Sequence, residues 1–268
     1  MRRLFLALTF TITAFLGIAA NNDEGNENAN TESLTNVALL GDSMTWIGGE
    51  NFEKPTGWTH YILDMPLNMR LYARSGATWC NTAYTVQDTD FYSEVIHPDN
   101  VIFNQTLRLI NDSDTFNPDI IIIYAGANDA WFADERPGLF NPFNPDEFNL
   151  RNCDPAGFTS LASSVVLSSS QLQSAFPNAR IFFITPVYGG KIPSERIEKV
   201  GDIIEECGAM LSIPVLRGDR LLPFREADEQ PGDFHYTYDG VHSNEQGAKA
   251  IADCVRKNIL HPYIQKMN

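Results

Sequence analysis

The chain of 268 residues is 43% hydrophobic and 11% aromatic, which suffices for one large α/β domain with its own core. Its formal net charge of −15 gives a surface that repels nucleic acid and anionic lipid. The composition therefore excludes nucleic acid as a partner and favours neutral or cationic substrates.

The first 20 residues have the pattern of a secretory signal peptide. Arg2 and Arg3 give a positive start, the segment 4–20 carries no charge, and small residues occupy its end. We therefore expect cleavage near Ala19 or Ala20 and export to the periplasm or the extracellular space. An uncleaved membrane anchor is the alternative, although the apolar stretch is slightly short for a span of about 20 residues. After removal of the leader we expect no contact with a membrane.

Residues 21–35 are predicted to form a flexible polar spacer, and residues 36–268 a single domain. The spacer is rich in Asn, Glu and Asp and contains almost no apolar side chains, so it cannot form a hydrophobic core. The leader holds two arginines and no acid, so the chain without it has 17 basic and 34 acidic residues, a net charge of −17. The domain is therefore strongly acidic.

Short apolar runs alternate with segments of helical spacing along this domain. In chain order we expect a strand at 37–40, a helix at 57–63, a strand at 69–73, a helix at 101–110, a strand at 119–124, a helix at 158–176, a strand at 180–185, a helix at 194–211, a strand at 213–216 and a helix at 244–259. This alternation predicts a flavodoxin-like three-layer α/β/α sandwich with a mainly parallel, five-stranded sheet. In such sheets the ligand site lies beyond the carboxyl ends of the strands. Two long irregular segments, 78–100 and 131–157, follow strand ends and are expected to wall that site.

A serine follows the first expected strand, and an Asp and a His share one loop before the last expected helix. These residues are Ser43, Asp239 and His242. A serine hydroxyl is a weak nucleophile that needs a neighbouring base, and the base needs an orienting partner. We therefore expect Ser43 to be the nucleophile, His242 its base and Asp239 the residue that orients the base.

Simpler interpretations of the same residues remain open. The serine fits a strand-to-helix turn, Asp239 a turn, and His242 a solvated loop. Ser243 fits the N-cap of the last helix, with Gln246 reaching back to it, which would place His242 just outside that helix. A metal site built from His235, Asp239 and His242 is another alternative, but no further ligand is evident, and we expect no metal.

Gly76 and Asn128 follow the second and third expected strands. Acyl transfer builds negative charge on the carbonyl oxygen, and each donor aimed at that oxygen is worth roughly a hundred- to a thousandfold in rate. The N–H of Gly76 can approach closely because no Cβ intrudes, and the amide of Asn128 can point at the same atom. Both are also common turn or cap residues, but together they predict an oxyanion-binding site at the rim that holds Ser43.

Four separated motifs are similar, in order, to those of the SGNH (GDSL-type) hydrolase superfamily. They are Gly41-Asp42-Ser43, Gly76, Gly126-Ala127-Asn128-Asp129 and Asp239-Gly240-Val241-His242, and the resemblance spans about residues 36–260. Met44 stands where the family name has Leu, and this change should affect packing only.

The resemblance implies a serine esterase without a metal or an organic cofactor. Ser43 would attack the ester carbonyl, and His242, held by Asp239, would take its proton and pass it to the leaving alcohol. The oxyanion hole would consist of the N–H groups of Ser43 and Gly76 and the amide of Asn128. Asp42 and Asp129 would brace the site rather than react.

The family includes lipases, thioesterases and esterases that remove acetyl groups from carbohydrates. The two long loops are polar but carry aromatic side chains, whose faces suit sugar rings. We therefore expect a small-molecule or oligosaccharide ester, in particular an acetylated carbohydrate, with Asp42, Trp79 and Trp131 as candidate contacts. Anchoring of the loops is the alternative role of the aromatic residues. A short-chain lipid or aryl esterase, or a catalytically idle glycan-binding module on the same fold, are the alternative functions.

Four cysteines, an even number in a chain expected to be exported, permit two disulfides. Cys207 and Cys254 lie in expected helices, whereas Cys80 and Cys153 lie in expected loops. We predict one pair within each set, with buried free thiols as the alternative. The spacing of the cysteines gives no sign of a zinc site. The oligomeric state is not readable from the sequence.

Overall fold

The computed structural model describes residues 34–80, 100–145 and 160–267. The predicted signal peptide lies outside the described residues, as does the predicted spacer up to residue 33. The spacer was predicted to end at residue 35, but Thr35 is already the first residue of a strand. Within the described residues, no helix is both long enough and apolar enough to cross a bilayer.

A five-stranded sheet forms the centre of the domain. Its strands are β1 (Thr35–Gly41), β2 (Leu67–Leu71), β3 (Ile120–Tyr124), β4 (Arg180–Ile184) and β5 (Val215–Leu216). All neighbouring strands are parallel, and their order is β2-β1-β3-β4-β5. This is the flavodoxin-like order, so the predicted fold is confirmed.

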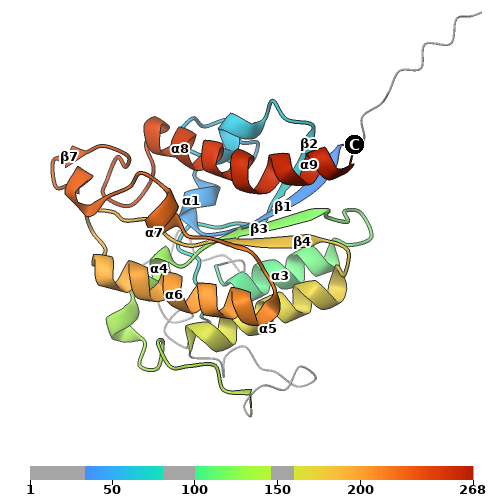
Figure 1. Cartoon of the computed structure of the whole chain (residues 1–268), viewed down its shortest axis with the longest axis horizontal. Coiled ribbons are helices and arrows are strands. Elements are labelled where there is room, and N and C mark those ends of the chain that lie inside the picture. The colour runs from blue at the N-terminus through green and yellow to red at the C-terminus, as the bar shows by residue number, and fades with distance from the viewer. Residues whose placement is uncertain (1–33, 81–99, 146–159, 268) are drawn as a thin grey trace, which may run out of the picture. The chain divides into compact units, whose positions relative to one another are not determined.

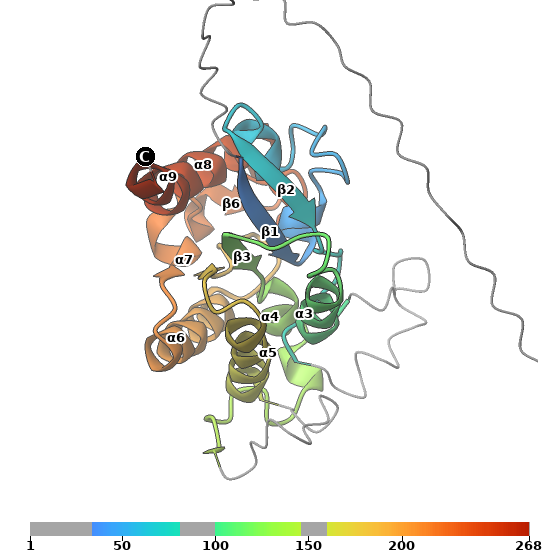
Figure 2. The same ribbon diagram turned by 90° about the vertical axis from the view of Figure 1, so that its right-hand side faces the viewer.

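Helices cover both faces of the sheet (Figures 1 and 2). The longer helices are α3 (Ile102–Asn111), α5 (Leu161–Ala175), α6 (Ser194–Leu211), α8 (Glu245–Val255) and α9 (His261–Met267). The shorter elements are α1 (Ser43–Trp46), α4 (Ala127–Trp131), α7 (Gly218–Leu221), the 3₁₀ helices η1 (Trp58–Ile62), η3 (Ala133–Glu135) and η6 (Glu226–Asp228), the π-helical turn η7 (Arg256–Leu260), and a hairpin of β6 (Glu229–Gln230) and β7 (Asp233–Phe234). Helices α3, α5 and α6 lie on one face, and α8 and α9 on the other.

The sheet separates two large apolar clusters. Alternate side chains of a strand point to opposite faces, so Ile121 and Ile123 of β3 join the cluster under α3, α5 and α6. Ile120 and Ile122 join the cluster under α8, which also contains Met44. Because β3 is buried on both faces, its sequence is a continuous apolar run rather than an alternating one. This burial makes the sheet a rigid base for the residues that follow its strands.

Three local predictions differ from the structure. The segment expected to be a helix at 57–63 is the 3₁₀ helix η1. The last strand was expected from residue 213, but it begins at Val215, because Pro214 has no N–H and the N–H of Ile213 bonds to the carbonyl of Gly208. Asn244, not Ser243, caps α8, since its side chain accepts from the N–H of Gly247 at 3.0 Å.

The predicted Cys207–Cys254 disulfide is wrong, because both residues are thiols in the structure. The Sγ of Cys207 instead donates to the carbonyl of Ala162 at 3.7 Å. Cys153 lies outside the described residues, so the Cys80–Cys153 pair stays a prediction.

Candidate active site

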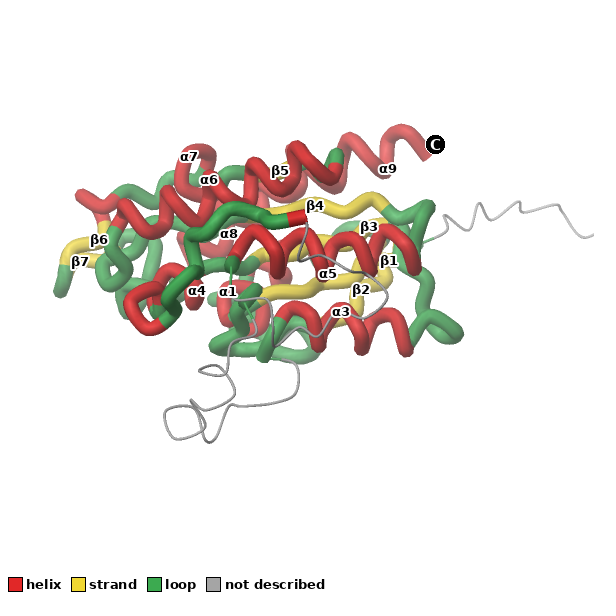
Figure 3. Tube along the Cα trace, turned by 90° about the horizontal axis from the view of Figure 1, so that it is seen from below, coloured by secondary structure: helices red, strands yellow, loops and turns green. Residues whose placement is uncertain are grey.

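The carboxyl ends of three neighbouring strands carry the residues expected to act together. Ser43 follows β1, Gly76 follows β2 and Asn128 follows β3. Since parallel strands end at the same edge of a sheet, these residues share one rim. Figure 3 shows α1 and α4 at that end of the molecule, far from the C-terminal end of α9.

The turn before Ser43 depends on a close backbone contact and on a buried side chain. Gly41 has a φ of +143°, and a Cβ there would lie 2.1 Å from the carbonyl oxygen of Tyr124. The buried amide of Gln105, from α3, binds both backbone groups of Gly41. Its Oε1 accepts from the N–H at 2.8 Å, and its Nε2 donates to the carbonyl at 2.9 Å. Gln105 therefore holds the turn that presents Ser43, a role that sequence reasoning missed.

Asp42 caps the short helix that begins at Ser43. Its Oδ1 accepts from the N–H of Met44 at 2.9 Å, and the side chain is fully buried. As the first residue of α1, Ser43 has an N–H without a partner inside the helix, which leaves that donor for an anion. The prediction of Asp42 as a substrate contact is wrong, because the residue lies beneath the rim and braces the turn.

The pKa of Asp42 is raised to about 7, chiefly because burial disfavours the charged form; the N–H of Met44 opposes this, and the nearby charge of Asp129 adds to it. The folded state therefore keeps this proton up to about pH 7, whereas the unfolded chain loses it near pH 4. Within that window the unfolded chain binds fewer protons, so the stability of the fold falls as the pH rises.

Replacing Asp42 with Asn is expected to flatten this dependence of stability on pH. An Asn keeps an oxygen for the N–H of Met44 but has no proton to lose. Between about pH 4 and pH 7 the free energy of unfolding of the wild type should fall by up to roughly 4 kcal/mol relative to the variant. Urea unfolding of both proteins at several pH values measures the difference. If the free energies of unfolding of the two proteins changed with pH in the same way, Asp42 would be ionised in the folded state over this whole pH range.

Asp239 and His242 form a direct pair. The Oδ2 of Asp239 lies 2.8 Å from Nδ1 of His242, and its Oδ1 accepts from the N–H groups of Val241 and His242 at 2.9 and 2.7 Å. Partial burial raises the pKa of Asp239, but the bonds from the ring and backbone of His242 outweigh it, so the pKa lies below its usual value. The carboxylate thus stays charged and holds Nδ1–H, which leaves Nε2 as the basic nitrogen.

The loop of this pair is connected to the helix that Ser43 begins through Thr56 and the first residue of η1. Ser243 donates its hydroxyl hydrogen to the carbonyl of Thr56 at 2.7 Å. Two residues later, Nε1 of Trp58 donates to Oγ1 of Thr45, in the helix that Ser43 begins, at 3.4 Å. These bonds place the Asp239–His242 loop at the rim that carries Ser43. They also explain why Ser243 is not a cap.

A hydrogen bond links the candidate oxyanion donor Asn128, which follows β3, to the turn after β2 that contains Gly76. Gly76 has a φ of +76°, the left-handed conformation that a glycine adopts without strain. The Nδ2 of Asn128 donates to the carbonyl of Ala77 at 2.9 Å. One N–H of this amide therefore fixes its position beside the Gly76 turn, and the amide has a second N–H for a ligand.

Asp129 anchors the chain that leaves this turn. Its two carboxylate oxygens accept from the N–H groups of Trp79 and Cys80 at 2.9 and 3.2 Å. Burial raises the pKa of Asp129, although the charge of Arg136 opposes the shift. Asp129 thus holds the segments after β2 and β3 together, which is the bracing that the motif implied.

Comparison with known protein families identifies the family of this chain. The model of the GDSL-like lipase/acylhydrolase family matches residues 39–250, which include all four motifs. The chain belongs to this family. The predicted resemblance and the prediction of an ester hydrolase are confirmed at that level.

Solved structures share the fold of this acylhydrolase. A protein from Bacteroides uniformis ATCC 8492, described as a GDSL-like lipase, is 21% identical over 87% of this chain and 99% of its own, with a TM-score of 0.54. The aryl esterase of M. smegmatis is 13% identical over 84% of this chain and 98% of its own, also with a TM-score of 0.54. A search of the curated proteins gave no match.

The candidate substrate contacts of this GDSL-like chain divide into buried and exposed residues. Trp79 is only 1% exposed and packs edge-on against Phe183 in the core, so its prediction as a substrate contact is wrong. Trp131, at the end of α4, is 42% exposed. Sequence reasoning missed Tyr238, which is 56% exposed and stacks on the ring of His242 with a centroid distance of 5.8 Å. The sequence did contain a signal for Tyr238, because it directly precedes Asp239 of the fourth motif.

The alternative metal site is not assembled in the described part of the chain. No group of three or more His, Cys, Asp and Glu side chains there could hold a metal ion. His235 instead lies 4.0 Å from a carboxylate oxygen of Asp228 and 3.7 Å from one of Asp233, whereas His242 pairs with Asp239. The two histidines therefore have separate partners.

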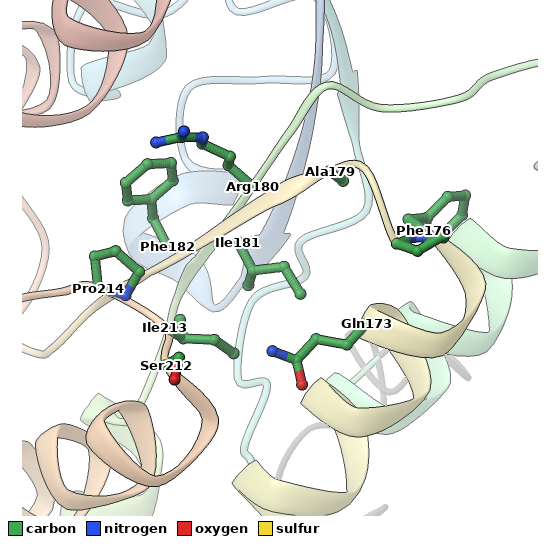
Figure 4. A pocket seen from close by; sticks show the side chains of 10 residues that line it. Gln173, Phe176, Ala179, Arg180, Ile181, Phe182, Ser212, Ile213 and Pro214 are labelled. Atoms are coloured by element: carbon green, nitrogen blue, oxygen red, sulfur yellow. The ribbon is translucent and has the colours of Figure 1, made fainter.

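A cavity of about 380 Å³ lies away from this acylhydrolase site (Figure 4). Its walls include Gln173 of α5, Arg180 and Ile181 at the start of β4, and Ile213 before β5. The start of a parallel strand is at the opposite edge of the sheet from the rim of Ser43. The cavity is therefore not part of the candidate active site.

Proposed function

We propose that the protein is an exported serine esterase in which Ser43, His242 and Asp239 act as nucleophile, base and orienting acid. The observation that carries the proposal is the 2.8 Å contact of Asp239 with Nδ1 of His242, on a loop bonded to the segment that packs on α1. The signal-peptide pattern of residues 1–20 supports export.

The proposed reaction begins when Ser43 Oγ attacks the ester carbonyl and its proton passes to Nε2 of His242. The N–H groups of Ser43 and Gly76 and the amide of Asn128 then stabilise the charge on the carbonyl oxygen. His242 passes the proton to the departing alcohol, and water, activated by the same imidazole, releases the acid from Ser43. Asp239 stabilises the imidazolium in both steps.

The proposed substrate is an acetylated carbohydrate. The exposed ring of Tyr238 directly precedes the fourth motif, and that of Trp131 comes shortly after the third. Aromatic faces beside polar groups suit sugar rings. A strongly acidic surface also suits a neutral glycan better than a polyanion. The alternatives are a short-chain lipid or aryl ester as the substrate, or glycan binding without catalysis.

Release of acetate from acetylated oligosaccharides tests this proposal directly. The wild type and Ser43→Ala should be compared on these substrates, on p-nitrophenyl acetate and on a fatty-acid ester. We expect Ser43-dependent release of acetate from the oligosaccharides to have the highest kcat/KM. Preference for the aryl or fatty ester would replace the substrate assignment, and glycan binding without hydrolysis would favour the idle module.

Removal of the Tyr238 ring is expected to weaken binding of the sugar. Tyr238→Ala should raise KM for the acetylated oligosaccharide roughly fivefold, since a stacked ring contributes about 1 kcal/mol. Tyr238→Phe keeps the ring and should keep KM. Initial rates over a range of oligosaccharide concentrations measure both values, and an unchanged KM in the alanine variant would remove Tyr238 from the binding site.

A further inference from the structure

Glu229, the first residue of β6, is fully buried although it carries a carboxyl group. Its Oε1 accepts from the backbone N–H of Tyr236 at 2.7 Å, and its Oε2 accepts from the hydroxyl of Thr237 at 2.5 Å. Both donors are neutral. Burying a carboxylate is costly unless its oxygens are hydrogen-bonded, so these two bonds determine where the chain around Thr237 lies.

The hydroxyl of Thr237 connects Glu229 to the loop of the proposed triad. Its oxygen accepts from the N–H of Gly240 at 3.0 Å, and Gly240 lies between Asp239 and His242. A threonine hydroxyl has one hydrogen, which Thr237 donates to the hydrogen bond with Glu229. The lone pairs of its oxygen therefore face the N–H of Gly240. Glu229 therefore orients the acceptor that holds the middle of the loop.

Backbone bonds close the loop around this point. The N–H of Tyr238 donates to the carbonyl of His242 at 3.0 Å, and Thr237 and Ser243 form an antiparallel bridge. The loop therefore has two anchors: the bond from Ser243 to Thr56 at its end, and the side chain of Thr237, which is 1% exposed, at its start.

We propose that Glu229 and Thr237 are positioning residues that hold the loop 239–242 in the geometry that catalysis requires. The proposal rests on the proposed function, because it concerns the placement of Asp239 and His242 relative to Ser43. Neither Glu229 nor Thr237 contacts the reacting atoms. They act through Gly240, and a displacement of about 1 Å at such a site is enough to cost roughly a hundredfold in rate.

A matched series at Thr237 tests this proposal. Thr237→Val keeps the shape but removes the hydroxyl, whereas Thr237→Ser keeps the hydroxyl. With p-nitrophenyl acetate as the probe, Thr237→Val should lower kcat roughly tenfold to a hundredfold and leave KM within about twofold. Thr237→Ser should lie within about threefold of the wild type. Thr115→Val, the same change at an exposed residue after α3, is the control and should have the wild-type kcat.

The proton between Nδ1 of His242 and Asp239 provides a readout that is independent of the substrate. A hydrogen bond between an imidazole and a carboxylate gives a far-downfield proton resonance, which Asp239→Asn should abolish and so assign. We expect the resonance in the wild type and in Thr237→Ser, and its loss or upfield shift in Thr237→Val. A purely structural role of the hydroxyl would lower stability without changing this signal in the folded protein.

Wild-type kcat and an unshifted resonance in folded Thr237→Val would overturn the proposal. If Thr237→Val does not unfold cooperatively, Glu229→Gln is the deciding variant, because it keeps the size of the side chain but presents a donor to Thr237. A wild-type kcat in Glu229→Gln would also overturn the proposal. Failure of the proposed function is distinguishable, because it would appear as equal activity of the wild type and Ser43→Ala, whatever the Thr237 series shows.

Discussion

Replacing Ser43 with Ala is expected to lower kcat for p-nitrophenyl acetate at least about a thousandfold, because the nucleophile and its proton transfer are lost together. The fold should survive, since Asp42 still caps α1 and Gln105 still holds Gly41. Burst and steady-state kinetics measure the loss, and the unfolding free energy reports on the fold.

Ser174→Ala provides the matched control for this experiment. Ser174 is an exposed residue near the end of α5, so its loss should leave kcat unchanged. Equal rates for the wild type and Ser43→Ala would discard the assignment of the nucleophile, even if hydrolysis itself persisted.

Asp239→Asn is expected to lower kcat roughly a thousand- to ten-thousandfold through the wrong imidazole tautomer. An Asn can still accept from the N–H groups of Val241 and His242, so the loop should keep its shape. Its amide N–H would face Nδ1 of His242, which places the ring hydrogen on Nε2 and leaves no base for Ser43.

Steady-state kinetics of Asp239→Asn and of the control Asp253→Asn measure this effect. Asp253 is exposed on α8, so the same change of charge there should not alter kcat. A loss below about tenfold for Asp239→Asn would mean that His242 is oriented by other contacts.

The sheet and its rim could be predicted because their signals are local. The four-isoleucine run of β3 and the chain positions of Ser43, Gly76 and Asn128 are visible without any knowledge of the tertiary structure. Since parallel strands end at one edge, element order alone places these residues together. The Asp239–His242 contact was predictable for a different reason: the two residues are three positions apart in one short loop.

The side chains that support the site were not predictable, since their partners are remote or atypical. Gln105 lies 64 residues from Gly41, inside a helix whose pattern resembles that of any amphipathic helix. Glu229 looks like a surface acid until its burial is known. Trp79 was misplaced because aromatic residues in a polar segment suggest a solvent-exposed wall, whereas this ring packs against Phe183.

The hydrogen bond from Ser243 to Thr56 joins segments 187 residues apart in the chain. Contacts of such long sequence separation form only after most of the polypeptide has collapsed. A chain that has been synthesised only as far as β5 therefore contains Ser43, the proposed nucleophile, but lacks His242, its proposed base. Hydrolytic activity should therefore arise only after the loop before α8 has docked against the segment around Thr56, and a partly folded chain should not cleave esters.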